Sequence, residues 1–190
     1  MGISNTTSKN EKDNLANGDY TISSRFVKWA HPDLRVTHCF NCVYNDRRIF
    51  EKKNSPPIGK KNHLFCECYY EYIRQKAFGT ISNKGAESPD IYLKVYGRLP
   101  DYYVTKQEAE EIYGWDSSKN TLAGKAPGKM IGGDIYGNIP PFLPEKDGRI
   151  WRECDIDYTE GRRNMKRLYY SSDGLMFYSP DHGITFYYIN

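Results

Sequence analysis

The stretch that decides the fold is Arg167-Leu-Tyr-Tyr-Ser-Ser-Asp-Gly-Leu-Met-Phe-Tyr178. In it, Asp173-Gly174 stands between two apolar and aromatic runs. An Asp-Gly pair readily adopts the left-handed backbone of a tight turn, so this pattern predicts an antiparallel hairpin. Working outward from it, we expect five strands, near residues 133–137, 149–154, 167–171, 174–178 and 184–189.

Two helices are predicted before these strands. Ser88-Pro89-Asp90 supplies an N-cap, a proline at the first helical position and an early acidic residue, and Gly97 ends this helix. Thr105-Lys-Gln-Glu108 has the spacing of a capping box and begins a second helix that ends near Gly114. Helices followed by an antiparallel meander are typical of an α+β fold.

The sequence has 190 residues, enough for one ordinary domain or two small ones. We predict four parts. They are a mobile Asn/Ser/Lys-rich segment (1–24), a Cys/His-rich module (25–79), a linker (80–87) and a compact domain (88–190).

Composition excludes some classes of protein. Aromatic residues make up 15% of the chain, which excludes a long disordered protein. The sequence contains no run of about 18 apolar residues, so we expect no membrane span. Residues 1–14 contain no apolar region of a secretory signal, so we expect synthesis in the cytoplasm.

Charge is distributed unevenly. Residues 1–87 hold 14 Lys/Arg and 9 Asp/Glu, whereas residues 88–190 hold 13 and 15. The second half therefore has no general basic field that would indicate nucleic-acid binding. It does have a local cluster, Arg162, Arg163, Lys166 and Arg167. Taken alone, such a cluster also fits a solvated turn.

Several separated motifs follow one another in the second half. They are Leu99-Pro-Asp-Tyr-Tyr-Val-Thr-Lys-Gln-Glu-Ala109, Ala126-Pro-Gly-Lys-Met-Ile-Gly-Gly-Asp-Ile135, Gly148-Arg-Ile-Trp-Arg-Glu-Cys-Asp-Ile-Asp-Tyr-Thr159, Gly161-Arg-Arg-Asn164, Arg167-Leu-Tyr-Tyr-Ser-Ser-Asp173 and Asp181-His182. In this order and almost without gaps, residues 88–190 resemble the barnase-type microbial ribonucleases, a guanyl-specific family. The resemblance implies N-terminal helices packed on a five-stranded antiparallel sheet.

The same resemblance implies an endoribonuclease that needs no metal or other cofactor for catalysis. Glu153 matches the general base that takes the proton of the RNA 2′-hydroxyl, and His182 matches the acid that protonates the leaving 5′-oxygen. A 2′,3′-cyclic phosphate forms first, and DNA is not cut. Alone, Glu153 also fits a polar residue on the wet face of a strand, and His182 an ordinary loop histidine.

Cations are implied around the scissile phosphate. Lys106, Arg163 and Arg167 match the family's catalytic cations, and Asp155 matches their structural counter-ion. Without the resemblance, Lys106 is simply a residue in the first turn of a helix. The positions assigned to substrate binding are Arg149, Asp134, Tyr136, Gly137 and Asn138.

Two departures from the family pattern affect substrate recognition. An Arg-Glu pair usually follows the equivalent of Asn138, but Ile139-Pro140 stands here. Without that carboxylate to accept the guanine N–H donors, we expect weak guanine preference. Gly183 replaces the tyrosine that tends to follow the catalytic histidine, which removes a stacking surface.

The first half contains Cys39-Phe-Asn-Cys42 and His63-Leu-Phe-Cys66-Glu-Cys68. Two ligand pairs at this spacing predict one structural tetrahedral zinc held by Cys39, Cys42, Cys66 and Cys68, with His38 or His63 as substitutes. Four free thiols in a reducing compartment are the alternative.

With Pro56-Pro57, these motifs also resemble the Cys/His C-terminal part of Mu-type phage head morphogenesis proteins, over residues 31–70. We therefore expect an RNA-cleaving toxin of a prophage-linked or polymorphic system. It is delivered by a non-classical or phage-linked route, and an acidic barstar-like inhibitor protects the producing cell. One alternative is a zinc-bearing phage structural or docking module with an inactive nuclease tail. Another is a non-catalytic RNA-binding module that uses tyrosine stacking.

Overall fold

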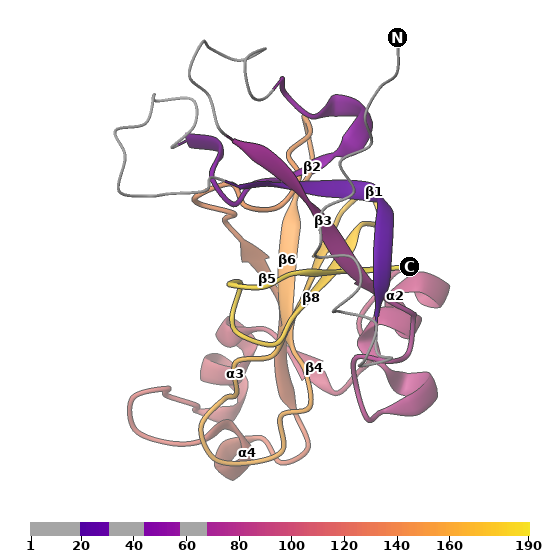
Figure 1. The fold of residues 1–190 in the computed structure, drawn as a ribbon. Coiled ribbons are helices and arrows are strands. Elements are labelled where there is room, and N and C mark those ends of the chain that lie inside the picture. The colour runs from indigo at the N-terminus through magenta and orange to yellow at the C-terminus, as the bar shows by residue number, and fades with distance from the viewer. Residues whose placement is uncertain (1–19, 31–43, 58–67) are drawn as a thin grey trace, which may run out of the picture.

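A computed structural model of the protein describes residues 20–30, 44–57 and 68–190 (Figure 1). The strands are β1 (Thr21–Ala30), β2 (Ile49–Glu51), β3 (Tyr69–Lys76), β4 (Tyr103–Val104), β5 (Met130–Tyr136), β6 (Trp151–Asp155), β7 (Arg167–Ser171), β8 (Met176–Ser179) and β9 (Tyr187–Ile189). The helices of this described part are α2 (Pro89–Tyr96), α3 (Lys106–Tyr113) and α4 (Leu122–Lys125), with two short 3-10 turns, η2 (Lys52–Asn54) and η4 (Gly85–Glu87).

The strands form one mixed sheet in the order β2-β1-β3-β9-β8-β7-β6-β5-β4. Strands β5 to β9 make antiparallel neighbours in chain order. Two pairs are parallel, β3 with β9 and β4 with β5. Strand β9 therefore lies inside the sheet, with β8 on one side and β3 on the other.

The expected five-stranded antiparallel sheet with N-terminal helices packed on it is wrong. The sheet has nine strands, two of its pairings are parallel, and the described helices are only four to eight residues long. The error comes from residues 21–76, whose cysteines suggested a metal module. This region supplies three strands, and the backbone N–H and C=O groups of a strand edge favour pairing with another strand.

The local helix signals are confirmed. In α3, the Thr105 side chain accepts from the Glu108 backbone N–H, and the Glu108 carboxylate accepts from the Thr105 N–H, which is the predicted capping box. Helix α2 has its proline in the first turn and ends at Gly97, whose φ of 71° is left-handed. Helix α4 and the two-residue strand β4 were not predicted.

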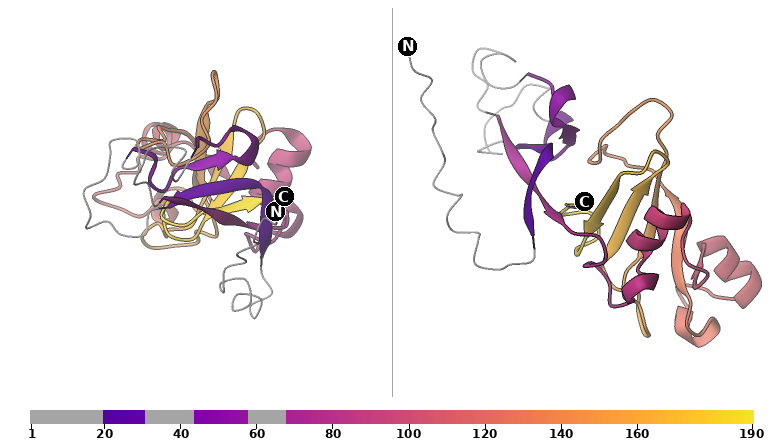
Figure 2. Two further views of the ribbon diagram at one scale, coloured as in Figure 1. Left: turned by 45° about the horizontal axis from the view of Figure 1, so that its top comes forward. Right: turned by 90° about the vertical axis from the view of Figure 1, so that its right-hand side faces the viewer.

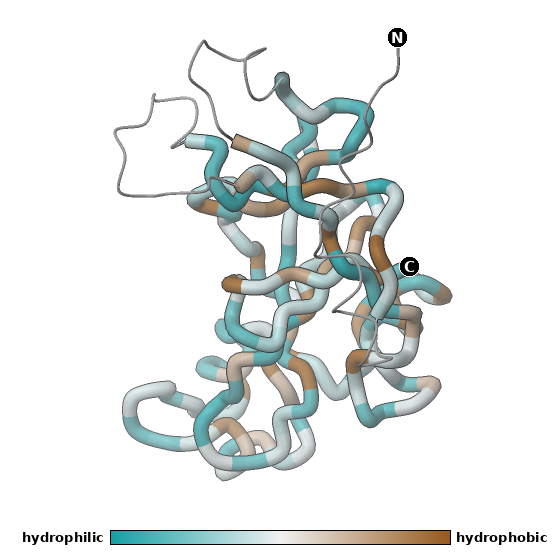
Figure 3. Tube along the Cα trace, in the orientation of Figure 1, coloured by the Kyte–Doolittle hydropathy of each residue, from teal (hydrophilic) through white to brown (hydrophobic). Residues whose placement is uncertain are grey.

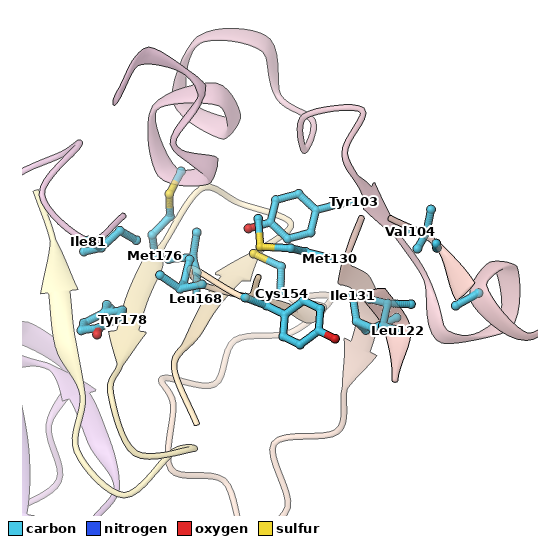
Figure 4. Close-up of a cluster of buried hydrophobic side chains, with 14 of the residues drawn as sticks. Ile81, Tyr103, Val104, Leu122, Met130, Ile131, Cys154, Leu168, Met176 and Tyr178 are labelled. Carbon is cyan, nitrogen blue, oxygen red and sulfur yellow. The ribbon is translucent and has the colours of Figure 1, made fainter. Parts of the chain in front are cut away.

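Side chains alternate between the two faces of the sheet, and each face has its own core. On one face, Cys154, Leu168 and Met176 pack with residues that precede the central strands, such as Ile81 and Tyr103. Figure 4 shows this cluster. On the other face, Trp151, Tyr169 and Phe177 pack with residues of the N-terminal strands, Phe26, Ile49 and Ile73.

This arrangement is visible in the views of the whole chain. In the right-hand view of Figure 2 the magenta and pink helices lie beside the orange and yellow strands, whereas a short purple coil lies beside the indigo and purple strands β1 and β3. Figure 3 shows hydrophobic and hydrophilic residues interspersed along the strands. The N-terminal strands thus share a core with one face of the central sheet.

Strand β1 combines a solvent-facing start with a buried end. Its residues up to Arg25 are mostly exposed, whereas Phe26 and Trp29 are fully buried. The register with β3 shifts between Ile22 and Val27, so the strand is irregular there. The division of the chain into parts at residues 24, 79 and 87 stays a prediction, although β1 begins at Thr21.

No helix of the described residues has the length and apolar character needed to cross a bilayer.

The shared core predicts that β2 stabilises the whole sheet. Ile49 is 1% exposed and packs in the cluster that includes Leu143 and Trp151. We expect Ile49→Ala to lower the free energy of unfolding in urea by about 3 kcal/mol, because it removes buried methyl groups and leaves a cavity. Ile22→Ala is the control: Ile22 is 54% exposed, and its loss is expected to cost less than about 0.5 kcal/mol. Equal effects of the two changes would contradict the shared core.

Candidate active site

Glu153 lies in the middle of β6, on the same face as Trp151 and Asp155. The antiparallel register sets it opposite Asp134 on β5 and Tyr169 on β7. Its side chain is 15% exposed, so the carboxylate is largely sheltered but reachable.

Lys106 approaches this carboxylate from the start of α3. Its Nζ lies 3.5 Å from Glu153 Oε1. The Asp134 carboxylate accepts a hydrogen bond from the Lys106 backbone N–H, with a shortest distance of 3.1 Å. Asp134 therefore fixes the beginning of α3 against β5, and this contact places the Lys106 ammonium beside Glu153.

Asp155 is the buried anchor of the two arginines. Its side chain is 0% exposed and accepts from Arg163 Nε at 2.7 Å and Arg163 Nη2 at 2.8 Å. Arg167 Nη1 lies 3.1 Å from the same carboxylate. Asp155 is thus the counter-ion of Arg163 and Arg167, as predicted, whereas Lys106, which was assigned to the same counter-ion, pairs with Glu153.

The two arginines differ in what else they can reach. The Arg163 side chain is 21% exposed, whereas that of Arg167 is 5% exposed. Burial alone would lower the pKa of Arg163, but the hydrogen bonds and charge of Asp155, with the charges of Glu153 and Asp134, raise it. Arg167 Nη1 also donates to two backbone carbonyls, and its buried Nε has no hydrogen-bond partner.

His182 is an exposed residue in the loop between β8 and β9. Its backbone has a left-handed φ of 57°, and its N–H donates to the Met165 carbonyl at 2.8 Å. Met165 lies between Arg163 and Arg167 in sequence, so the acid loop, residues 179–185, contacts the segment that carries the arginines. Within the acid loop, Asp181 Oδ1 accepts from the Thr185 N–H at 2.7 Å.

Tyr169 is a functional candidate that the sequence reasoning missed. It is 1% exposed and pairs with Glu153 in the β6–β7 register. A Cβ on Gly183, the residue after His182, would lie 3.2 Å from the Tyr169 hydroxyl oxygen. Tyr169 therefore borders both the strand of the predicted base and the loop of the predicted acid. Burial raises the pKa of Tyr169, and the charge of Glu153 raises it further, so the phenol stays neutral.

The base loop, residues 137–145, follows β5. The Asn138 side chain is used within it, because its Nδ2 donates to the Leu143 carbonyl at 3.0 Å and its Oδ1 accepts from the Leu143 N–H at 2.9 Å. The Tyr136 ring packs against the Tyr169 ring at an angle of 56°, with ring centroids 4.6 Å apart. Burial raises the pKa of Tyr136, with a further contribution from Glu153. Tyr136 thus links the base loop to the Glu153 region.

Arg149 is held away from the Glu153 cluster. Its guanidinium pairs with Asp173 through two hydrogen bonds of 2.8 Å and donates to the Pro144 carbonyl at 2.7 Å. Its side chain is 4% exposed. With Gly137 and Asn138 it lines a cavity of about 310 Å³ beside the base loop. The observed contacts show Arg149 supporting this loop and the β7–β8 turn.

A ribonuclease of Heyndrickxia coagulans is 53% identical over 95 residues, which are half of this chain and 86% of that protein. The chain belongs to this ribonuclease family. Ribonucleases of Bacillus intermedius and Bacillus pumilus are also 53% identical over 95 residues, and the match spans 58% of the length of each. No protein-family model matches the chain.

The larger cavity of the protein, about 770 Å³, lies elsewhere. It is bordered by α2, α3 and the Arg152 face of the sheet, and none of the predicted site residues lines it. Because Glu153 and Asp155 point to the opposite face, we locate the candidate site by its acid–base groups and cations and not by cavity size.

The predicted metal ligands of the first half lie almost wholly outside the described residues. This holds for Cys39, Cys42, Cys66, His38 and His63. Cys68 is described; its side chain is buried and packs with Trp29. The described ranges contain no group of three His, Cys, Asp or Glu side chains placed to hold a metal. The zinc site therefore stays a prediction, as does the resemblance of residues 31–70 to phage head proteins.

The Arg149–Asp173 pair predicts a dependence of stability on pH. Hydrogen bonds from Arg149, Ser171 and Lys146 outweigh burial and lower the pKa of Asp173. Because the folded pKa lies below the unfolded value of about 3.9, this stabilisation is present above pH 3.9 and is lost as pH falls towards the folded pKa. We expect Asp173→Asn to lower the urea unfolding free energy by about 2 kcal/mol at pH 7 and by progressively less below pH 4.

The control for this measurement is Asp147→Asn at an exposed loop position. We expect its unfolding free energy to follow that of the wild type at every pH. A constant difference between Asp173→Asn and the wild type from pH 7 to pH 2.5 would contradict the assignment.

Proposed function

We propose that residues 88–190 form an endoribonuclease that cleaves single-stranded RNA through its 2′-hydroxyl, by the general acid–base chemistry of the barnase type. The observation that carries the proposal is the environment of Glu153. Its carboxylate lies on the sheet face of the Asp155–Arg163–Arg167 cluster, 3.5 Å from the Lys106 ammonium. In the strand register Glu153 pairs with Tyr169, which borders the His182 loop. The match to proteins named ribonucleases supports the same conclusion.

In the first step, Glu153 accepts the proton of the 2′-hydroxyl while the 2′-oxygen attacks phosphorus. The Lys106 ammonium has two effects in this step. It lies beside the Glu153 carboxylate, which favours the ionised base. The same charge attracts the phosphate oxygens, whose negative charge grows as the new P–O bond forms.

Arg163 and Arg167 supply further stabilisation of that charge. Arg163 binds Asp155 through Nε and Nη2, so its Nη1 can donate to a phosphate oxygen. Arg167 is more deeply buried, with its side chain 5% exposed, so it contributes its positive charge from within the sheet. Because Asp155 is inaccessible to solvent, the arginines cannot swing away without leaving a buried charge unpaired. Fixed donors of this kind need little reorganisation during the reaction.

His182 completes the step by giving its proton to the departing 5′-oxygen, and the P–O5′ bond breaks. The products are a 2′,3′-cyclic phosphate and a free 5′-hydroxyl. In the slower hydrolysis of the cyclic phosphate, His182 takes a proton from water and protonated Glu153 returns one to the 2′-oxygen. The exposure of His182 is consistent with access to solvent in both steps.

We further propose that this enzyme discriminates weakly among bases. The base loop carries Ile139-Pro140, and Ile139 is 89% exposed. The Asn138 amide is already paired with Leu143. A site that offers few unpaired polar groups to a base loses little when the base changes.

The central experiment is cleavage of single-stranded RNA in EDTA, with chromatographic detection of cyclic-phosphate ends. We expect the wild-type protein to produce these ends. Glu153→Gln and His182→Ala are each expected to slow cyclic-phosphate formation by about 10²–10⁴-fold, the usual contribution of general acid–base groups. Glu110→Gln, on the exposed side of α3, is the matched control and should retain full activity.

Cleavage that survives Glu153→Gln would remove the mechanism. Absence of cleavage by the wild-type protein would favour one of the two other functions, a docking module with an inactive nuclease tail or a non-catalytic RNA-binding module. Retained RNA binding without cleavage would indicate the second of these.

We also propose that the protein acts as a toxin that an acidic barstar-like inhibitor restrains. Expression of the wild-type chain in bacteria should then arrest growth, because cytoplasmic RNA is degraded. Glu153→Gln should be tolerated at the same protein level. Growth curves measure the arrest and immunoblots measure the protein level. Equal toxicity of the wild-type chain and Glu153→Gln would contradict this role. The route of delivery and the zinc-bearing module remain predictions.

A further inference from the structure

The segment Tyr44–Glu51 contacts two loops of the candidate site that are far away in the sequence. One is the base loop, residues 137–145. The other is the acid loop, residues 179–185, which carries His182. The family resemblance covers residues 88–190, so these contacts come from a part of the chain that the resemblance does not include.

The contact with the base loop begins with the backbone. The Ile49 N–H donates to the Phe142 carbonyl at 2.7 Å. The Ile49 side chain, 1% exposed, packs in the same cluster as Leu143, which is fully buried. Arg48 adds an ion pair with Glu145. The segment is therefore attached to the base loop by a backbone hydrogen bond, by packing of buried side chains and by an ion pair.

Arg47 reaches both loops with one side chain. Its guanidinium carbon lies 4.9 Å from the centroid of the Phe142 ring in the base loop. Its Nη2 donates to the Ile184 carbonyl in the acid loop at 3.1 Å. A planar guanidinium can stack on a ring and donate in its own plane at the same time.

The backbone of Arg47 is itself fixed. Its N–H donates to the Trp29 carbonyl at 3.0 Å, and Trp29 is a fully buried residue of β1. Arg47 has a left-handed φ of 63°. A non-glycine residue pays roughly 1–2 kcal/mol for that conformation, so it persists where surrounding contacts hold it. The side chain thus extends from a firm attachment.

The acid loop has an unusual backbone conformation around His182. His182 and Gly183 both have left-handed φ values, 57° and 86°. Ile184, whose carbonyl Arg47 holds, is only two residues after His182, and its own side chain is 64% exposed. A hydrogen bond at Ile184 therefore acts directly on the backbone that directs the imidazole.

We propose that Arg47 is a positioning residue for RNA cleavage, fixing the acid loop against the base loop so that His182 is directed at the leaving 5′-oxygen. This inference rests on the proposed function of His182. Proton transfer requires donor and acceptor at hydrogen-bond distance, and a misplacement of about 1 Å can cost up to 10²-fold in rate. The N-terminal strands are then part of the catalytic apparatus and not an independent attachment.

The test compares two substrates that differ only in the leaving group. One is a dinucleoside phosphate, whose 5′-alkoxide must be protonated as it leaves. The other is the 3′-(4-nitrophenyl phosphate) of the same nucleoside, whose phenolate leaves without a proton. A defect in the placement of the general acid slows the first reaction and spares the second. Effects on the base or on nucleoside binding appear with both.

We expect Arg47→Ala to lower kcat for the dinucleoside phosphate about tenfold and to leave kcat for the nitrophenyl ester within twofold of the wild type. His182→Ala should show the same pattern with a larger ratio, whereas Glu153→Gln should slow both substrates. Arg47→Lys retains a cation near the Ile184 carbonyl and should recover part of the loss.

Arg25→Ala is the matched control. Arg25 lies on β1, pairs with Glu51 at 2.9 Å and has its guanidinium carbon 5.1 Å from the Phe26 ring centroid. Its change removes the same charge, one ion pair, two ring contacts and a hydrogen bond to the Tyr188 hydroxyl. Glu51, Phe26 and Tyr188 all lie outside the base loop and the acid loop. We expect it to have wild-type kcat with both substrates. Thermal unfolding of each variant verifies that the folded protein is being measured.

The proposal is overturned if Arg47→Ala matches the wild type on both substrates, slows both equally, or behaves as Arg25→Ala does. Failure of the proposed function has a different signature. In that case the wild-type protein does not cleave the dinucleoside phosphate, or His182→Ala shows no dependence on the leaving group. If Arg47→Ala does not fold, the same two-substrate comparison is made with Arg47→Lys, and equal kcat ratios for it and the wild type overturn the proposal.

Discussion

The buried carboxylate of Asp155 is the interaction on which the candidate site depends. A charge with no exposure to solvent is stable in a protein only when it is paired and fully hydrogen-bonded. Arg163 and Arg167 provide that pairing, so both guanidinium groups are drawn to the sheet face that carries Glu153. The same requirement shapes the loop that follows β6, because the chain must bring Arg163 back to Asp155, the last residue of that strand. Electrostatic need within the core therefore arranges the cations that a phosphodiester would meet.

Sequence reasoning found what depends on local chemistry. The capping box at Thr105, the glycine that ends α2, and the Asp-Gly turn each act over a few residues, and the structure contains them. The number of strands was missed because pairing joins residues far apart. Nothing within Tyr69–Lys76 indicates that its partner is Tyr187–Ile189. Strand β1 was missed because its first five residues are mostly polar and lack the alternation of a half-buried strand, although Phe26 and Trp29 later in it are fully buried.

The candidate site shows the same division between local motifs and contacts over long sequence distances. Glu153, Asp155, Arg163 and Arg167 could be named from motifs, since they lie within one hairpin of the sheet. Tyr169 could have been found from strand alternation, because it stands two positions after Arg167 and so shares its face. Asn138 and Arg149 were harder to assign, since their partners Leu143 and Asp173 depend on how two loops fold. Arg47 gave no signal, because its contacts lie with loops almost a hundred or more positions later.

The parallel pairing of β3 with β9 has a consequence for how the protein comes into being on the ribosome. Synthesis proceeds from the N-terminus, and domains tend to fold as their segments emerge. Here β1 to β3 emerge early but keep one open edge until Tyr187–Ile189 has been made. Pairings between such distant segments form slowly, since a long intervening chain must first be ordered. The nascent chain thus carries an unsealed edge at β3 while residues 77–186 are being made, and the sheet cannot close until β9 has emerged.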